Sequence, residues 1–73
     1  MSETALADYD RAIELDPRRA LAYANRGWAR LLLGDELEAG KGFQKCFELD
    51  EALRIRFEPL INKQRRQLAE TQR

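Results

Sequence analysis

Histidine is absent from this chain of 73 residues, and cysteine occurs only once. Without histidine, the chain lacks the side chain that most often acts as a base near neutral pH. A single cysteine cannot form an internal disulfide, and it has no cysteine or histidine partner with which to bind zinc. We therefore expect no metal, no cofactor and no enzymatic activity.

Long apolar runs are also missing. No run approaches the roughly 20 apolar residues that a helix needs to cross a bilayer, and no signal peptide is recognisable. Glycine and proline, with four and two residues, are too sparse for a linker or a fibrous protein. The composition, 44% hydrophobic and 36% charged, suits a small helical domain. We expect a soluble, cytoplasmic protein that does not contact membranes.

Excess charge is absent too, because 13 basic residues balance 13 acidic ones. A net charge of zero gives no general reason to expect nucleic acid as a partner. The charge is nevertheless uneven, since residues 51–73 carry six basic and three acidic side chains. Binding of nucleic acid through this basic end, around Arg65 and Arg66, is therefore the least favoured of the functions considered.

An internal repeat is the strongest signal that is present. A shift of 34 residues places "YDRAIELDP", which starts at Tyr9, over "FQKCFELDE", which starts at Phe43. Further along, Tyr23 falls on Phe57, so size and polarity are preserved beyond the turn. Periods of this length are typical of proteins built from stacked helical hairpins.

Turn-forming residues divide the chain into helices. Proline at position 17 disfavours helical geometry in the residue before it, and Gly34 can end a helix in the left-handed conformation. Asp35 can then cap the helix that follows. These signals predict an all-α fold of about four antiparallel helices, at residues 3–15, 20–33, 36–49 and 52–71. Pro59 would either bend the last helix or mark its first turn.

With these features, the chain resembles the tetratricopeptide repeat family, whose unit of about 34 residues comprises a helix A, a turn and a helix B. The residues that carry the resemblance are Tyr23 and Gly27 in helix A, Gly34-Asp35 at the turn, and Ala39, Phe43 and Cys46 in helix B. Arg30, Gly40, Gly42 and Glu51 depart from the family pattern.

The resemblance implies a single domain, a short right-handed solenoid of helical hairpins. Residues 1–19 would be helix B of a partial repeat, 20–53 a full repeat, and 52–73 a capping helix. In the capping helix, one side carries Leu53, Phe57, Leu60, Ile61 and Leu68. The other side carries Arg54, Arg56, Lys63, Arg65 and Arg66, as expected of a helix that covers the apolar end of a solenoid.

In this family helix A lines the surface that binds proteins or peptides. The resemblance therefore implies a partner site on helix A, with Leu21, Asn25, Trp28 and Leu32 as its candidates. The Trp28 indole could anchor a partner or pack against a neighbouring helix, and both alternatives stay open. Arg26 and Arg30, one turn apart, could attract acidic peptides.

A first helix without its own helix A would leave Leu6, Tyr9 and Ile13 partly uncovered. Burial of one such side chain is worth roughly 1.5–3 kcal/mol, so we expect self-association through these residues, as in a homodimer. The preferred function is thus a protein-interaction or assembly module. The alternative is a structural homo-oligomer whose apolar surfaces bury against a second copy.

Overall fold

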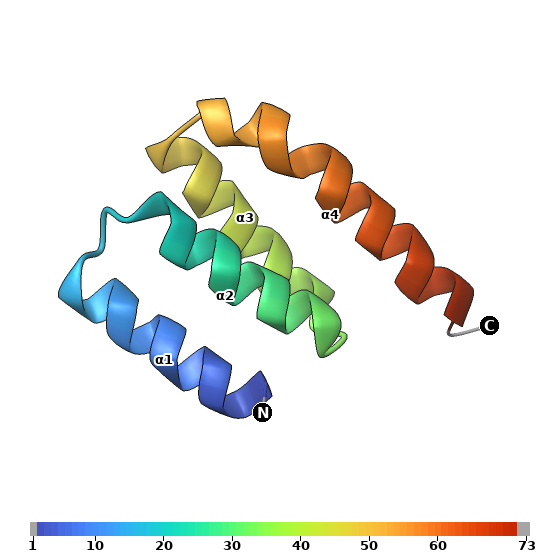
Figure 1. Cartoon of the computed structure of the whole chain (residues 1–73), viewed down its shortest axis with the longest axis horizontal. Helices are drawn as coiled ribbons and strands as arrows, with labels where there is room; N and C mark the ends of the chain where they lie inside the picture. Colours follow the sequence, from blue (N-terminus) through green and yellow to red (C-terminus); the bar gives the residue numbers. More distant parts are fainter. Residues whose placement is uncertain (1, 72–73) are drawn as a thin grey trace.

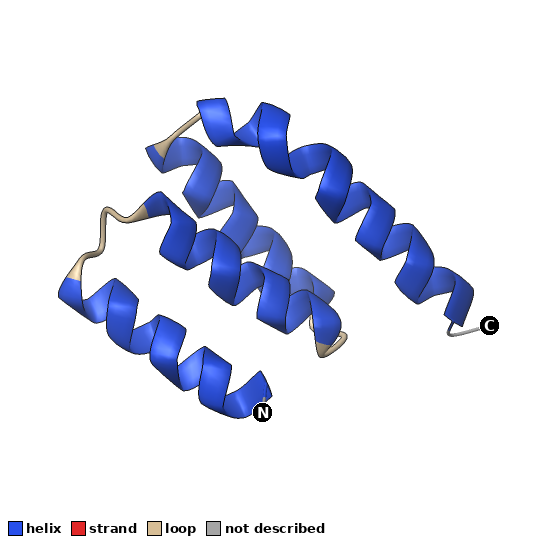
Figure 2. Cartoon of the chain, in the orientation of Figure 1, coloured by secondary structure: helices blue, strands red, loops and turns tan. Residues whose placement is uncertain are grey.

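The computed structural model describes residues 2–71 and contains four helices within that range, with no strand (Figure 2). They are α1 (Ser2–Leu15), α2 (Ala20–Leu32), α3 (Glu36–Leu49) and α4 (Ala52–Thr71). The all-α fold is therefore confirmed, and each predicted helix boundary lies within one residue of the observed one.

Consecutive helices run in opposite directions, as Figure 1 shows. The hairpin of α2 and α3 occupies the middle of the molecule, with α1 against α2 on one side and α4 on the other. As a result, α2 and α4 run in the same direction, and α4 contacts both helices of the hairpin.

The turn between α2 and α3 follows from its two residues. Gly34 has a φ of +85°, in the left-handed region that glycine enters at little cost. Asp35 is the N-cap of α3, where its side chain accepts a hydrogen bond of 3.4 Å from the Glu38 amide. The chain therefore reverses within three residues, Leu33 to Asp35, and α3 returns along α2.

The other two turns resemble each other, although only one contains proline. Asp16 and Asp50, which are 34 positions apart, both accept a hydrogen bond from the amide two residues later, at 3.2 Å. The Tyr23 hydroxyl also donates to the Pro17 carbonyl at 2.9 Å, which ties the first of these turns to α2.

Two glycines allow α2 and α3 to approach closely. A Cβ atom on Gly42 would lie 3.0 Å from the Tyr23 carbonyl oxygen and 3.2 Å from the Gly27 Cα. A Cβ atom on Gly27 would lie 3.0 Å from the Ala39 carbonyl oxygen. The two backbones therefore meet where neither residue has a side chain. Gly42, which departs from the family pattern, is part of this contact.

The core forms around this contact and consists of Tyr23, Ala24, Leu31, Ala39, Phe43, Cys46, Phe47 and Ile61. Cys46 is completely buried, and burial raises the pKa of its thiol, with a smaller contribution from the negative charge of Asp50. A buried thiol with a raised pKa behaves as a small apolar side chain and is a poor nucleophile.

Helix α4 is held less tightly than the others. Its one buried residue is Ile61, while Leu53, Phe57 and Leu68 are partly buried against the core. Pro59 lies inside α4, so the helix begins seven residues before it and the proline does not mark its first turn.

The close contact between helices predicts opposite effects for two glycine substitutions. Gly42→Ala should lower the free energy of unfolding by about 1–3 kcal/mol, because the new methyl group meets backbone atoms that cannot move aside. Gly40→Ala should raise it by about 0.5–1 kcal/mol, because glycine is unfavourable inside a helix and only the Arg65 guanidinium lies nearby, at 3.9 Å. Urea denaturation measures the free energy of unfolding of both variants. An equal change in the two variants would contradict the close contact between α2 and α3.

The buried thiol predicts a loss of stability at alkaline pH. The unfolded chain ionises Cys46 near pH 9.0, whereas the folded chain retains the proton to higher pH. The unfolded state therefore releases its proton first, and the free energy of unfolding falls as pH rises above that value. Urea denaturation between about pH 8 and 10 should show a shallower decline for Cys46→Ala than for the unsubstituted chain. Parallel declines would exclude a contribution from this thiol.

Candidate functional site

An apolar groove of about 280 Å³ lies between α2 and α4, with α3 at its base. Its lining is mostly apolar, and its polar side-chain groups are the amide of Asn25 and the indole N–H of Trp28. The seven lining residues are Ala24, Asn25 and Trp28 from α2, Phe43 from α3, and Phe57, Leu60 and Ile61 from α4. The groove therefore has α2 as one wall and α4 as the other.

Trp28 is the largest side chain in this groove. Its indole is half-buried and packs edge to face on Phe43, with 6.4 Å between the ring centroids and 70° between the ring planes. The packing that the sequence offered as one alternative is therefore present. It does not exclude the other alternative, because the indole also lines the groove.

The structure brings together two of the four residues predicted for the partner site. Asn25 and Trp28 line the groove, whereas Leu21 and Leu32 lie exposed on α2 outside its lining. The groove residues of α4 were not predicted as part of the site. The sequence contained one signal for them, because Leu60 follows Phe57 at helical spacing on the apolar side of the last helix.

The arginines of α2 form ion pairs outside the groove. Arg26 forms an ion pair of 2.8 Å with Asp10 of α1, and Arg30 pairs with Asp35 at 3.5 Å. Both were predicted candidates for attracting acidic peptides, but each already has an acidic partner in its own chain. These two residues are therefore weak candidates for that role.

Unpaired positive charge lies instead on α4. Arg56 and Lys63 are exposed and form no ion pair with any side chain between residues 4 and 71. They lie one helical turn before and after Leu60, and the Arg56 guanidinium is 6.0 Å from the ring centroid of Phe57. Helix α2 contributes no acidic residue to the opposite wall. The groove is therefore apolar inside and basic along its α4 edge.

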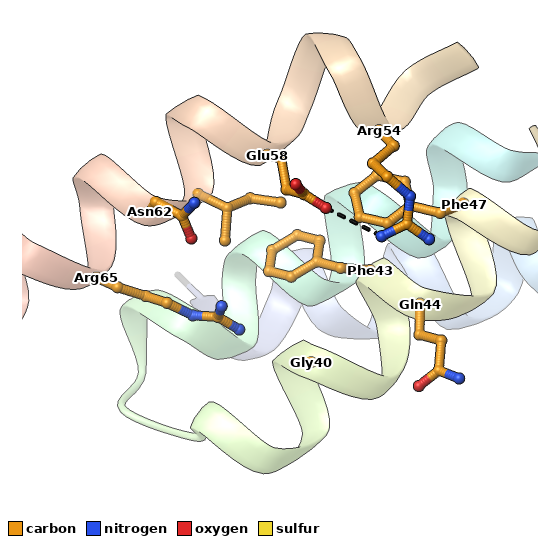
Figure 3. Close-up of a pocket in the computed structure, with 9 residues that line it drawn as sticks. Gly40, Phe43, Gln44, Phe47, Arg54, Glu58, Asn62 and Arg65 are labelled. Carbon is orange, nitrogen blue, oxygen red and sulfur yellow. Dashed lines mark hydrogen bonds and ion pairs between the residues drawn. The ribbon is translucent and has the colours of Figure 1, made fainter. Parts of the chain in front are cut away.

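A second hollow, of about 380 Å³, lies between α3 and α4 (Figure 3). The rings of Phe43 and Phe47 line it, and the Arg54 guanidinium lies 4.8 Å from the centroid of the Phe47 ring. Arg54 also donates to Glu58 at 3.0 Å, as Figure 3 shows.

Arg65, at the other end of this hollow, pairs with Glu36 of α3, although the sequence placed it on the outer side of α4. Since both arginines of this hollow are paired within the chain, its charge is largely satisfied and it is a weaker site than the groove.

The residues predicted for self-association face α2 in part. Leu6, Tyr9 and Ile13 are all half-buried, and Ile13 packs against the core. Their role in association stays a prediction, with α2 covering some of the surface that it would use.

Among the residues that the structure describes, no group of acidic, cysteine or histidine side chains could hold a metal ion. In the same part of the chain, none of the helices combines the length and apolar character needed to cross a membrane.

Comparison with known proteins gives one match. A sequence model described as tetratricopeptide repeat matches residues 8–41, which run from within α1 through α2 into α3. No curated protein and no solved structure matches the chain. The match and the four-helix arrangement agree with the 34-residue spacing of equivalent side chains and turns. The chain is a tetratricopeptide-repeat-like protein with about one and a half repeats.

Proposed function

We propose that this chain is a non-catalytic interaction module, which binds a peptide or helix of another protein in the groove between α2 and α4. Tetratricopeptide repeats generally mediate protein–protein interaction, and the family is typically non-catalytic. The observation that carries the proposal is the apolar groove, with the Trp28 indole on one wall and Leu60 on the other.

The groove suits one or two apolar side chains of a partner. A volume of about 280 Å³ accommodates side chains the size of leucine or phenylalanine. Burial of each is worth roughly 1.5–3 kcal/mol. Packing on Phe43 restrains the Trp28 indole before a partner arrives, so little conformational entropy is lost on binding. The Asn25 amide can both donate and accept hydrogen bonds, which suits a partner's backbone.

The basic edge of the groove favours an acidic partner. Arg56 and Lys63 would lie beside a segment bound over Leu60, and neither has a competing acidic neighbour in an ion pair. Exposed charges of this kind act mainly on association rate and selectivity, and salt weakens them. We infer that the partner segment presents apolar residues to the groove and acidic residues to α4.

The alternative is that a second copy of this chain covers the same apolar surfaces. Leu32, Leu33 and Leu37 lie exposed around the turn between α2 and α3, outside the groove. A surface of this kind can associate with itself. Sedimentation with and without a groove-binding peptide separates the two functions, because only the alternative predicts that the peptide reverses the increase in mass at high protein concentration.

Trp28→Ala should weaken binding of a peptide, selected against the folded chain from a displayed library, by at least about tenfold. The indole supplies the largest apolar surface of the groove, so its removal leaves the partner's side chain without its main contact. Fluorescence anisotropy with the labelled peptide measures the dissociation constant. Circular dichroism shows whether the variant stays folded, since the indole also packs on Phe43.

Two further variants keep this experiment decisive. Leu60→Ser changes a groove residue that is 52% exposed, so it should weaken binding with little loss of stability. Leu37→Ala removes a leucine that is 72% exposed and lies outside the groove, so it should leave binding unchanged. Equal effects of Leu60→Ser and Leu37→Ala would place the peptide elsewhere.

The double variant Arg56→Glu/Lys63→Glu should bind an acidic amphipathic peptide at least about tenfold more weakly than the unsubstituted chain at low salt. The probes are two labelled helical peptides with the same leucine stripe, one with glutamate and one with lysine at the remaining positions. The double variant Lys45→Glu/Arg66→Glu is the matched control, because it makes the same change in charge at exposed basic residues outside the groove lining.

Each outcome has a separate meaning. Equal binding of both peptides, lost on Trp28→Ala, would retain the groove and remove the preference for acidic partners. Salt-sensitive binding of a labelled oligouridine, lost in Lys45→Glu/Arg66→Glu, would instead favour nucleic acid as the partner.

A further inference from the structure

The junction between α3 and α4 is short and contains no proline. Only Asp50 and Glu51 separate the two helices, and the backbone leaves helical geometry at Asp50, where φ is −150° and ψ is 93°. At the equivalent junction between α1 and α2, Pro17 occupies the position that corresponds to Glu51, and four residues separate the helices. Proline prevents α1 from continuing into α2. No residue prevents α3 from continuing into α4.

The contact of α4 with the hairpin is also thin. Ile61 is 2% exposed, and it lines both the groove on one side of α4 and the hollow on the other. These two spaces, of about 280 and 380 Å³, replace side-chain contacts that a tightly packed helix would make. By contrast, Gly27 and Gly42 bring α2 and α3 into backbone contact. Helix α4 is therefore the helix that leaves the central hairpin most easily.

A hairpin without α4 would expose an apolar surface of defined shape. Phe43 and Phe47, both almost completely buried, would lose the cover that Ile61 and Phe57 provide. Glu36 would lose its ion pair with Arg65. A second copy of this chain has an α4 of the same sequence. That helix can therefore make the same contacts with the exposed hairpin as the chain's own α4.

We propose that two copies of the chain exchange α4. In the exchanged form, Asp50 and Glu51 become helical and join α3 to α4 as one helix over residues 36–71. Each α4 then packs on the hairpin of the other copy, in a reciprocal dimer. The contacts distant from the junction, those of Ile61 and the pair of Arg65 with Glu36, form between the copies instead of within one.

The exchange changes the composition of the groove. Ala24, Trp28 and Phe43 would come from one copy, and Leu60 and Ile61 from the other. Each dimer would contain two such grooves, so the partner copy completes the site. The exchange itself does not depend on which partner the groove binds.

The free-energy difference between the two forms is small, because most contacts are common to both. The separate helices retain the hydrogen bond of 3.2 Å between the Asp50 carboxylate and the Ala52 amide. The joined helix gains backbone hydrogen bonds across the junction. Protein concentration therefore decides which form dominates, and the dimer fraction rises with it.

Glu51→Pro should abolish the exchange and leave the monomer intact. Asp50 is already extended, as a residue before proline prefers, and no group among residues 2–71 accepts a hydrogen bond from the Glu51 amide. In the joined helix, however, proline at position 51 would lie in the interior. Sedimentation equilibrium should show a dimer dissociation constant raised by at least about a hundredfold. Glu51→Ala is the matched control, since it removes the same ion pair with Arg54 but permits a helix.

Asp50→Ala should favour the exchanged dimer, whereas Glu51→Pro should prevent it. It removes the side-chain hydrogen bond that favours separate helices and introduces a strong helix former, so it should increase the dimer fraction by about three- to tenfold. A chain that stays monomeric at all concentrations, even as Asp50→Ala, would overturn the proposal. A dimer that Glu51→Pro leaves unchanged would also overturn it, because association would then use another surface.

Discussion

The four-helix arrangement is built on the close approach of α2 and α3 at Gly27 and Gly42. No side chain separates the two backbones at this contact, and Leu31 of α2 and Phe43 of α3 are both buried in the core that surrounds it. The hairpin then presents one surface to α1 and another to α4. The groove exists because this central hairpin is tight enough to hold Trp28 against Phe43 while α4 lies further away.

Much of the fold could be predicted because local signals and the repeat agreed. Gly34 and Pro17 marked turns through backbone chemistry alone, and the 34-residue spacing showed which apolar positions were equivalent. Helix boundaries followed from these residues to within one position. The turns at Asp16 and Asp50 even share the same side-chain hydrogen bond, although one contains proline and the other does not.

The composition of the groove could be predicted only in part, because it depends on how α4 is rotated. Ile61 is buried at the position that corresponds to Gly27, so α4 does not reproduce the packing of α2. The ion pairs of long charged side chains were harder to predict than the lining of the groove. The sequence could not show that Arg26 reaches Asp10 of α1, or that Arg65 reaches Glu36 of α3, since these pairs depend on the separation of helices.

Trp28 is the only tryptophan in the chain, and it lies at the edge of the groove with one side still open to water. Its ultraviolet emission is therefore a built-in optical reporter of groove occupancy. A bound side chain would displace solvent from the indole and move the emission to shorter wavelength, whereas withdrawal of α4 would move it to longer wavelength. One intrinsic signal thus distinguishes a filled groove from an opened one.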